Sequence, residues 1–484
     1  MNRPLTFATI CSLSLLSGCM IGPKYKKPMT PMAPAFKEQP PASFKESNGW
    51  KTAQPDDQAI RGKWWEMFGD AQLNGLEDQL TVSNQNLKVS EARFRQARAM
   101  IKYNRSAMYP TISAGPSITN ERESPNQPYF PSYAANNGTG DFSMPMDMSY
   151  EVDLWGKIRR TVNASREEAQ ASAADVQTAA LSLHAELAVD YFELRSADAQ
   201  KQLLDDTVKA YTDALTLTQQ RLEGGVAPKA DMEQAQTQLD GAKVEDTDVT
   251  VMRAEYEHAI ATLIGKPPAQ FSITFAPQTP LQLPVIPVGL PSTLLERRPD
   301  IAADERRVAE ANDQIGIAQT AYYPSLDLGA MGGFAATSMA NWFTWPSRMW
   351  AVGGSMSETL FDAGRRRSVV TSATANYDGT VAAYRQTTLT AFQQVEDNLS
   401  SLRILEGEAQ QQHHATASAS ASLDLFTSRY KGGVDDYLEV ITAQTILLAN
   451  QRNDIDIQRR RMEASVLLIK AIGGGWNSTQ LPKL

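Results

Sequence analysis

Cysteine and histidine are scarce in this sequence. Its 484 residues include two cysteines, Cys11 and Cys19, and four histidines, His184, His258, His413 and His414. The histidines show neither the His-x3-His spacing nor the Cys/His spacing of a metal site. We therefore expect no metal and no other cofactor. Because Cys11 lies in a leader that we expect to be removed, we also expect no internal disulfide.

Features of several other protein classes are missing as well. No run of 18 apolar residues is present, so we expect no transmembrane helix. The formal net charge of −9 disfavours nucleic acid as a partner. No nucleophile elbow, phosphate-cradling loop or supported pair of carboxylates occurs, and we therefore expect no enzyme.

The sequence begins with an apolar run over residues 5–16 that ends in Leu-Ser-Gly and Cys19. This run is too short to span a bilayer and has the form of a bacterial secretory signal with a lipobox. We expect residues 1–18 to be removed and Cys19 to carry covalent lipid, unless the cysteine stands there by chance. By resemblance to bacterial lipoproteins, Met20 after the cysteine favours sorting to the outer membrane. The proline-rich residues 19–60 should be extended over the surface or disordered.

Proline and glycine are absent from residues 158–223, and an unbroken helix of that length would be about 100 Å long. Its lower half carries a seam for a partner helix, at alternating steps of three and four residues. The seam consists of Leu194, Ala197, Lys201, Leu204, Val208, Tyr211, Leu215, Thr218 and Leu222. Alanines in the upper half allow close approach on two sides, which favours a helix in a curved wall. A plain coiled-coil rod would explain the seam alone.

Two turns with paired glycines end the long helical stretches. The first turn contains Gly224 and Gly225, and the second contains Gly432 and Gly433. Glycine can adopt the positive φ that ends a helix. Pro228 suits the first turn of the next helix in one copy, and Asp435 suits an N-cap in the other. Each turn is therefore predicted to be the tip of a helical hairpin, over residues 221–231 and 429–439.

The two turns belong to a larger duplication. The spaced pattern of residues 87–115 recurs 214 positions later in residues 301–329, and further matches follow at offsets of 206–208. We expect pseudo-twofold internal symmetry with four parts after the N-terminal segment. These parts are a first repeat (61–265), a proline-rich equatorial linker (266–300), a second repeat (301–475) and a C-terminal tail (476–484). In the linker we expect only short strands such as Phe271–Phe275.

A two-residue alternation replaces the helical period after Tyr109-Pro110 and again after Tyr323-Pro324. It predicts β-hairpins over residues 111–154 and 325–361, with one apolar and one polar face, as a transmembrane barrel requires. Four strands are too few to close a barrel, and an open edge in lipid would leave backbone groups without partners. We therefore expect partner chains, and three copies would supply twelve strands.

Other interpretations of these strands stay open. They could form the edge of a soluble β-sandwich. Met144, Met146 and Met148 could bind copper(I), which thioether ligands select. However, their spacing places them together on the apolar face of one strand, where packing against lipid is the simpler explanation.

Five motifs in order resemble the outer-membrane efflux proteins of the TolC family, in the lipoprotein branch typified by OprM and NodT. The motifs lie at Trp64–Leu73, Leu294–Ile301, Leu360–Arg365, Arg429–Val434 and Gly473–Trp476. The resemblance implies a mixed fold, all-α plus transmembrane β, in an internally duplicated protomer with four strands and long helical hairpins. It also implies a homotrimer that forms a 12-stranded β-barrel and an α-helical barrel.

The function implied by this resemblance is a passive exit duct. The duct would be a lipid-anchored protein of the outer membrane, with its helical part in the periplasm. Its partners would be outer-membrane lipids, a periplasmic adaptor and an inner-membrane pump of the resistance–nodulation–division type. Two alternatives remain: an outer-membrane duct for type I protein secretion, and a structural lipoprotein that does not conduct.

The resemblance also implies a site at the periplasmic tip. Val434 and Leu438 match positions where the family narrows its pore, and Glu439 matches an acidic aperture position. Thr442 departs from the pattern, because many relatives carry an aspartate there. The remaining tip residues are expected to form turns and to contact the adaptor, and they are Gly224, Gly225, Pro228, Asp231, Gly432, Gly433 and Asp435. A simpler interpretation is that Leu438 is buried helix packing and Glu439 a solvated carboxylate favoured by the helix dipole.

Overall fold

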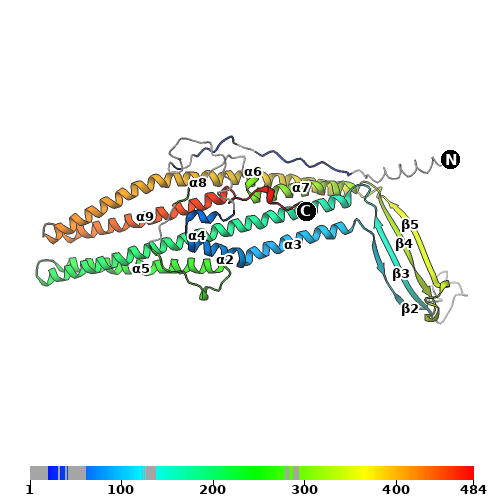
Figure 1. Cartoon of the computed structure of the whole chain (residues 1–484), viewed down its shortest axis with the longest axis horizontal. Coiled ribbons are helices and arrows are strands. Elements are labelled where there is room, and N and C mark those ends of the chain that lie inside the picture. The colour runs from blue at the N-terminus through cyan, green and yellow to red at the C-terminus, as the bar shows by residue number, and fades with distance from the viewer. Residues whose placement is uncertain are drawn as a thin grey trace.

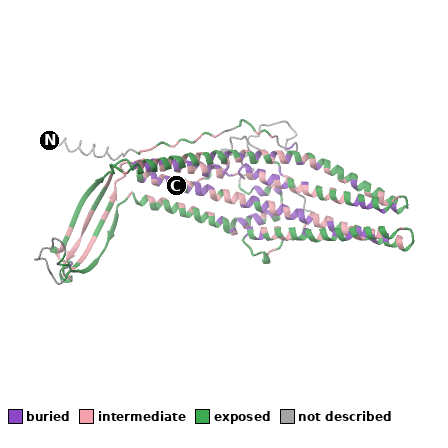
Figure 2. Cartoon of the chain, turned by 180° about the vertical axis from the view of Figure 1, so that it is seen from behind, coloured by how far each residue is buried: buried purple, intermediate pink, exposed green. Residues whose placement is uncertain are grey.

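The computed structural model describes residues 20–30, 33–38, 41, 62–122, 124, 126, 138–277, 283–286 and 294–484. Cys19, the predicted lipidation site, lies outside the described residues. The chain forms an elongated body of long helices with an antiparallel sheet at one end (Figure 1). Figure 2 shows that buried residues are concentrated in the helical body, whereas the sheet is mostly exposed or half-buried.

The long helices occur in pairs of equal length. They are α3 (Gln85–Ser106) and α7 (Pro299–Thr320) with 22 residues each, α4 (Lys157–Glu223) and α8 (Arg365–Lys431) with 67, and α5 (Lys229–Leu263) and α9 (Tyr437–Ala471) with 35. The shorter helices are η2 (Trp64–Phe68), α2 (Ala71–Ser83), η4 (Pro268–Gln270), α6 (Leu294–Arg297), η6 (Met339–Asn341), η7 (Trp345–Ser347) and η8 (Ser478–Gln480). The predicted internal duplication is confirmed.

Both copies contribute to one antiparallel sheet. Its strands are β1 (Thr111–Ala114), β2 (Ser117–Glu121), β3 (Thr139–Glu151), β4 (Ser325–Ala336) and β5 (Arg348–Ser357). Their order is β1-β3-β4-β5, and β2 also pairs with β3. The first predicted strand is therefore divided in two. The reason is the Gly115-Pro116 step, because proline has no N–H for a sheet hydrogen bond.

The register gives the sheet two different faces. One cross-strand row places Met146 opposite Gly332 and Gly332 opposite Trp350. The next row on this face contains Met148, Ala330 and Val352. A row on the other face contains Glu151, Asp327 and Ser355. The prediction that the three methionines of β3 share the apolar face is confirmed.

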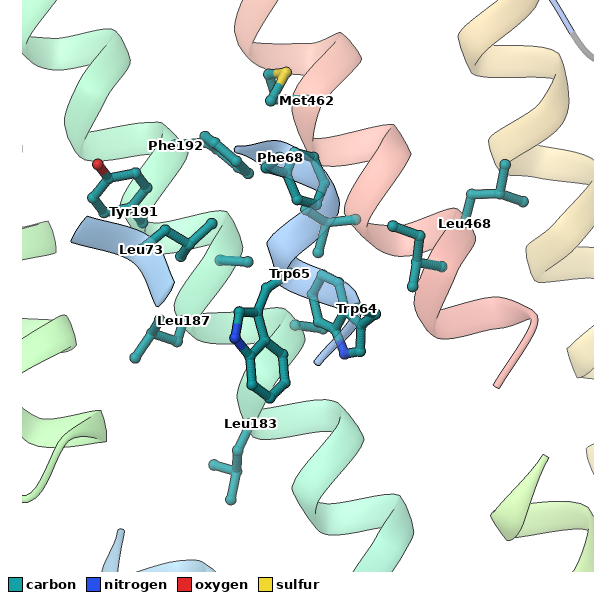
Figure 3. Packing of buried hydrophobic residues seen from close by; sticks show 14 of the residues in the cluster. Trp64, Trp65, Phe68, Leu73, Leu183, Leu187, Tyr191, Phe192, Met462 and Leu468 are labelled. Carbon is teal, nitrogen blue, oxygen red and sulfur yellow. The ribbon is translucent and has the colours of Figure 1, made fainter. Parts of the chain in front are cut away.

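An aromatic cluster forms the centre of the largest core. Trp64, Trp65 and Phe68 of η2 are buried between α4 and α9 (Figure 3). Asp70 follows η2 and caps α2 by accepting from the backbone N–H groups of Gln72 and Leu73. Its second carboxylate oxygen accepts a 2.6 Å hydrogen bond from the Tyr191 hydroxyl of α4. We call this region the equatorial core, after its place midway along the helices.

The described residues of the N-terminal segment, which we call the strap, run along the outside of the helices (Figure 1). Buried Arg160 holds its start by donating to the carbonyl oxygens of Ile21 and Pro23, and it forms a 2.6 Å ion pair with Asp313. Further along, the backbone N–H groups of Lys37 and Glu38 donate to the Glu396 carboxylate, at 2.7 and 2.9 Å.

The predicted strand at Phe271–Phe275 is wrong. The segment is extended, but side chains of α4 and α5 bind its backbone in place of a neighbouring strand. Arg253 donates to the carbonyl of Ile273 at 2.7 Å, and Arg195 donates to that of Thr274 at 2.9 Å. The Ala276 N–H donates to Asp198 at 3.1 Å. Fully buried Asp198 also pairs with Arg195 and Arg253, at 2.8 and 2.7 Å.

We expect Asp198→Ala to destabilise the protein, because Arg195 and Arg253 would lose the buried carboxylate with which they pair. Removing one partner of a buried charge network typically costs about 3–5 kcal/mol. The measurement is the thermal unfolding midpoint of the detergent-purified protein by circular dichroism. Asp240→Ala is the control, because Asp240 is exposed and, among the described residues, pairs only within its own helix. Equal midpoints for the two variants would contradict this account of the network.

Candidate functional site

The tips of the two helical hairpins have the same backbone geometry. In each glycine pair the second residue takes the left-handed conformation, with φ of +68° at Gly225 and +74° at Gly433. Gly224 and Gly432 keep helical values. The N–H of Val226 then bonds to the carbonyl of Arg221 at 2.9 Å. The predicted roles of these glycines in ending α4 and α8 are confirmed for one residue of each pair.

The starts of the following helices differ from the prediction by one residue. Pro228 precedes the first residue of α5 and is not part of its first turn. Asp436, not Asp435, is the residue before α9. Asp435 instead forms a bidentate pair with Arg429, with its Oδ1 2.8 Å from Nη2. This hydrogen bonding lowers the pKa of Asp435.

An arginine joins the first tip to the second. The Arg221 guanidinium lies over the Tyr430 ring, 4.5 Å from its centroid, and donates to the Tyr430 carbonyl at 3.2 Å. The Tyr430 hydroxyl lies 3.5 Å from the carboxylate of Asp231, and burial raises the pKa of both groups. Asp231, predicted as an outer adaptor contact, is thus half-buried and faces the other hairpin.

The four predicted aperture residues lie together on the outside of this tip. Val434, Leu438, Glu439 and Thr442 are all exposed, whereas Tyr437, Val440 and Ile441 between them are buried. Leu438 is 58% exposed, so it does not belong to the core of a single chain. This argues against the simpler interpretation of Leu438 as helix packing. We call these four residues the exposed stripe. Exposure of its apolar members, Val434 and Leu438, costs free energy in water unless another chain or a narrow pore covers them.

A buried titratable pair lies in the equatorial core and has no counterpart in our sequence predictions. Glu77 of α2 and Nδ1 of His184 of α4 are 2.6 Å apart, and the Trp65 ring stacks on the imidazole at 4.4 Å. Burial raises the pKa of Glu77 and lowers that of His184, and it therefore favours the neutral form of each group. The pair is therefore a hydrogen bond within the core. In the described part of the chain, no group of three or more potential ligands forms a metal site.

The described helices include none that combines the length and the apolar character needed to cross a membrane. The profile of the family described as "Outer membrane efflux protein" matches residues 76–266 and 290–474. This chain belongs to the outer membrane efflux protein family. The resemblance drawn from the five sequence motifs is confirmed.

Related proteins align over nearly the whole chain. SepC of Pseudomonas putida, named a probable efflux pump outer membrane protein, is 30% identical over 468 residues, which cover 96% of this chain and 95% of SepC. The outer membrane protein OprJ of Pseudomonas aeruginosa is 29% identical over 483 residues, which cover 99% of this chain and 97% of OprJ.

Solved structures agree with the fold. The outer-membrane channel OprN is 26% identical with a TM-score of 0.84, over 95% of this chain and 100% of that one. The CmeC outer membrane channel of Campylobacter jejuni has a TM-score of 0.87 at 23% identity, over 96% of each chain, and supports the fold alone. The chain is an outer-membrane component of an efflux system, with its helical part in the periplasm.

We expect Arg221→Ala to loosen the contact between the two hairpin tips. The variant loses a cation–π contact and two hydrogen bonds, to the carbonyls of Tyr430 and Lys431. Together these are worth about 1–2 kcal/mol, and amide exchange at the tips should become about tenfold faster. Hydrogen exchange followed by mass spectrometry measures this rate. Arg429→Ala is the matched control, because the ion pair of Arg429 in the described part of the chain is with Asp435 of its own turn. Unchanged exchange in Arg221→Ala would show that this contact does not hold the tips together.

Proposed function

We propose that this protein is a passive exit duct, without catalytic activity, for small molecules delivered by an inner-membrane pump. The observation that carries the proposal is the two-faced sheet, which continues directly into helices of 67 residues. An apolar face and a face with carboxylates suit a wall between lipid and water. A structural tether would need no such polar face.

We further propose that the working form is a homotrimer. Among the described strands, β5 pairs only with β4, and β1 and β2 pair only with β3. Each side of the sheet therefore ends in backbone groups without sheet partners, which is costly in a bilayer. Three sheets joined edge to edge would close a barrel of twelve strands, with the broken β1–β2 counted as one. The long helices below would then close into an α-helical barrel.

The partners are a periplasmic adaptor at the hairpin tips and a pump of the resistance–nodulation–division type. Relatives support an efflux role: TtgF of Pseudomonas putida, 30% identical to this chain, is named a toluene efflux pump outer membrane protein. An outer-membrane duct for type I protein secretion is the runner-up. A wide polar duct passes what its pump delivers, so the pump selects the cargo.

At the tip, the exposed aperture residues would meet their symmetry copies at the axis of the trimer. Three Leu438 side chains would exclude water, and three Glu439 carboxylates would repel one another and attract cations. Thr442 adds no second acidic ring, because its side chain is an uncharged hydroxyl, which donates to the Leu438 carbonyl at 2.9 Å. Cation block should therefore be weaker than with two acidic rings.

Replacing both Leu438 and Glu439 by alanine tests the duct and its aperture together. We expect single-channel conductance in planar bilayers to rise by about twofold or more, since the variant removes the apolar ring and its charges. Cells carrying the variant should also become sensitive to large antibiotics such as vancomycin.

The control replaces Glu223 and Val226, which are exposed at the first tip, by alanine, and its conductance should match the unaltered protein. Light scattering establishes that each variant is a trimer. If neither the unaltered protein nor the variants conduct, the duct proposal is wrong. If all conduct equally, these residues do not form the gate.

We also propose that Cys19 carries covalent lipid and thereby anchors the chain to outer-membrane lipids. Met20 and Ile21 lie beside the connection between β3 and α4, where the Ile21 N–H bonds to the Trp155 carbonyl at 3.1 Å. Met20 and Ile21 thus lie at the boundary between the sheet and the helices. A lipid attached at this boundary could enter the inner leaflet next to the sheet.

The variant Cys19→Ser should lose palmitate labelling yet still insert into the outer membrane, because the strands provide their own anchorage. Membrane fractionation with radiolabelled palmitate measures both properties. Labelling that persists in the variant would rule out Cys19 as the acceptor. Loss of insertion would instead make the lipid the main anchor.

A further inference from the structure

The apolar face of the sheet is hollowed near the end that lies farthest from the helices. The hollow has a volume of about 680 Å³. Six of its lining residues are Met144, Met146, Gly332, Phe334, Phe343 and Trp350, and Arg348 also lines it. We propose that this hollow binds an acyl chain of a phosphate-bearing lipid from the outer leaflet of the outer membrane. The inference rests on the proposed insertion of the sheet in that membrane.

The hollow exists because Gly332 leaves the middle of the face bare. A Cβ atom added at this glycine would meet no other heavy atom within 4 Å. Its neighbours in the same row are the larger Met146 and Trp350, which are 53% and 80% exposed. Two large side chains thus flank the glycine and give the hollow apolar walls. We call this hollow the slot.

The chemistry of the walls suits a flexible hydrocarbon chain. Methionine side chains are unbranched and polarisable, so they adapt to an irregular apolar ligand. Phe334 and Phe343 pack edge to face at 5.6 Å and stiffen the other side of the slot. Phe343 is itself 61% exposed, so an acyl chain could cover its free face.

Arg348 places a positive charge at this slot. Arg348 lies opposite Phe334 on the apolar face, at the first residue of β5. Its Nε donates to the Trp345 carbonyl at 2.7 Å, which fixes the guanidinium against the indole ring. Its two terminal nitrogens have no hydrogen-bond partner among the described residues. A guanidinium held in this way complements a phosphate, which accepts two parallel N–H bonds.

The position of the slot in the fold indicates which leaflet of the outer membrane it contacts. The slot lies by the connection between β4 and β5, at the opposite end of the sheet from the helices (Figure 1). Since the helical part is periplasmic, this end of the sheet lies toward the cell exterior. The lipid within reach is therefore one of the outer leaflet, where phosphorylated multi-chain glycolipid is the main component in Gram-negative bacteria.

Native mass spectrometry of the full-length protein, titrated with hexa-acylated lipid A or with phosphatidylglycerol, tests the proposal. We expect one lipid A per chain, bound more tightly than phosphatidylglycerol. Gly332→Leu should fill the slot, and Arg348→Gln should remove the phosphate partner. Each variant should weaken lipid A binding by about tenfold, which corresponds to about 1.4 kcal/mol.

Matched controls separate the slot from general effects on the sheet. Gly353→Leu adds the same side chain on the opposite face, where a Cβ also meets no atom within 4 Å. Arg122→Gln removes a charge just after β2, and both controls should bind lipid A like the unaltered protein.

Binding that Gly332→Leu leaves unchanged, or equal affinity for both lipids, would overturn the proposal. Planar-bilayer conductance of the unaltered protein is measured in parallel. A conducting protein without a lipid A site refutes this inference alone, whereas a protein that does not conduct refutes the proposed duct.

Discussion

The long helices depend on the aromatic residues that η2 inserts between them. A helix of 67 residues exposes far more surface than one neighbour can cover, and most helix stability in proteins comes from tertiary packing. Trp64, Trp65 and Phe68 enter from an element outside the helical wall and contact α4 and α9 at once (Figure 3). Just below, the charged network around Asp198 fastens the segment after η4 to α4 and α5. The middle of the molecule is therefore the place where elements from both repeats are joined.

Sequence patterns predicted the regular elements well, because those patterns are local. The absence of glycine and proline delimited α4 within one residue, and alternation located the strands. The errors arose where distant side chains decide the outcome. Asp435 and Asp436 are equally good N-cap residues, and the pairing of Asp435 with Arg429 settles which one precedes α9. Glu77 and His184 are 107 positions apart, so no local signal could pair them.

At the candidate site, too, local patterns were predicted and contacts between distant residues were not. Motif positions indicated the stripe of Val434, Leu438, Glu439 and Thr442, and the structure adds that all four are exposed on one chain. The contact of Arg221 with Tyr430 joins residues 209 positions apart and had no sequence signal.

A proline within the sheet also depends on a contact that the sequence did not indicate. Pro145 in β3 lies opposite Gly333, where any Cβ would collide with the Met144 carbonyl. A proline in a central strand is therefore tolerated only because its neighbour is glycine.

The strap places a constraint on how the chain reaches its native state. Its contacts bridge some of the largest sequence separations in the molecule, since Lys37 and Glu396 are 359 positions apart. Folding slows as contacts become less local, because the intervening chain must be ordered first. The strap is synthesised first, but it can bind Glu396 only after α8 has been synthesised. Arg160, which donates to the carbonyls of Ile21 and Pro23, likewise lacks its ion-pair partner Asp313 until α7 has been synthesised. The strap can thus reach its native position only after the second repeat has been synthesised.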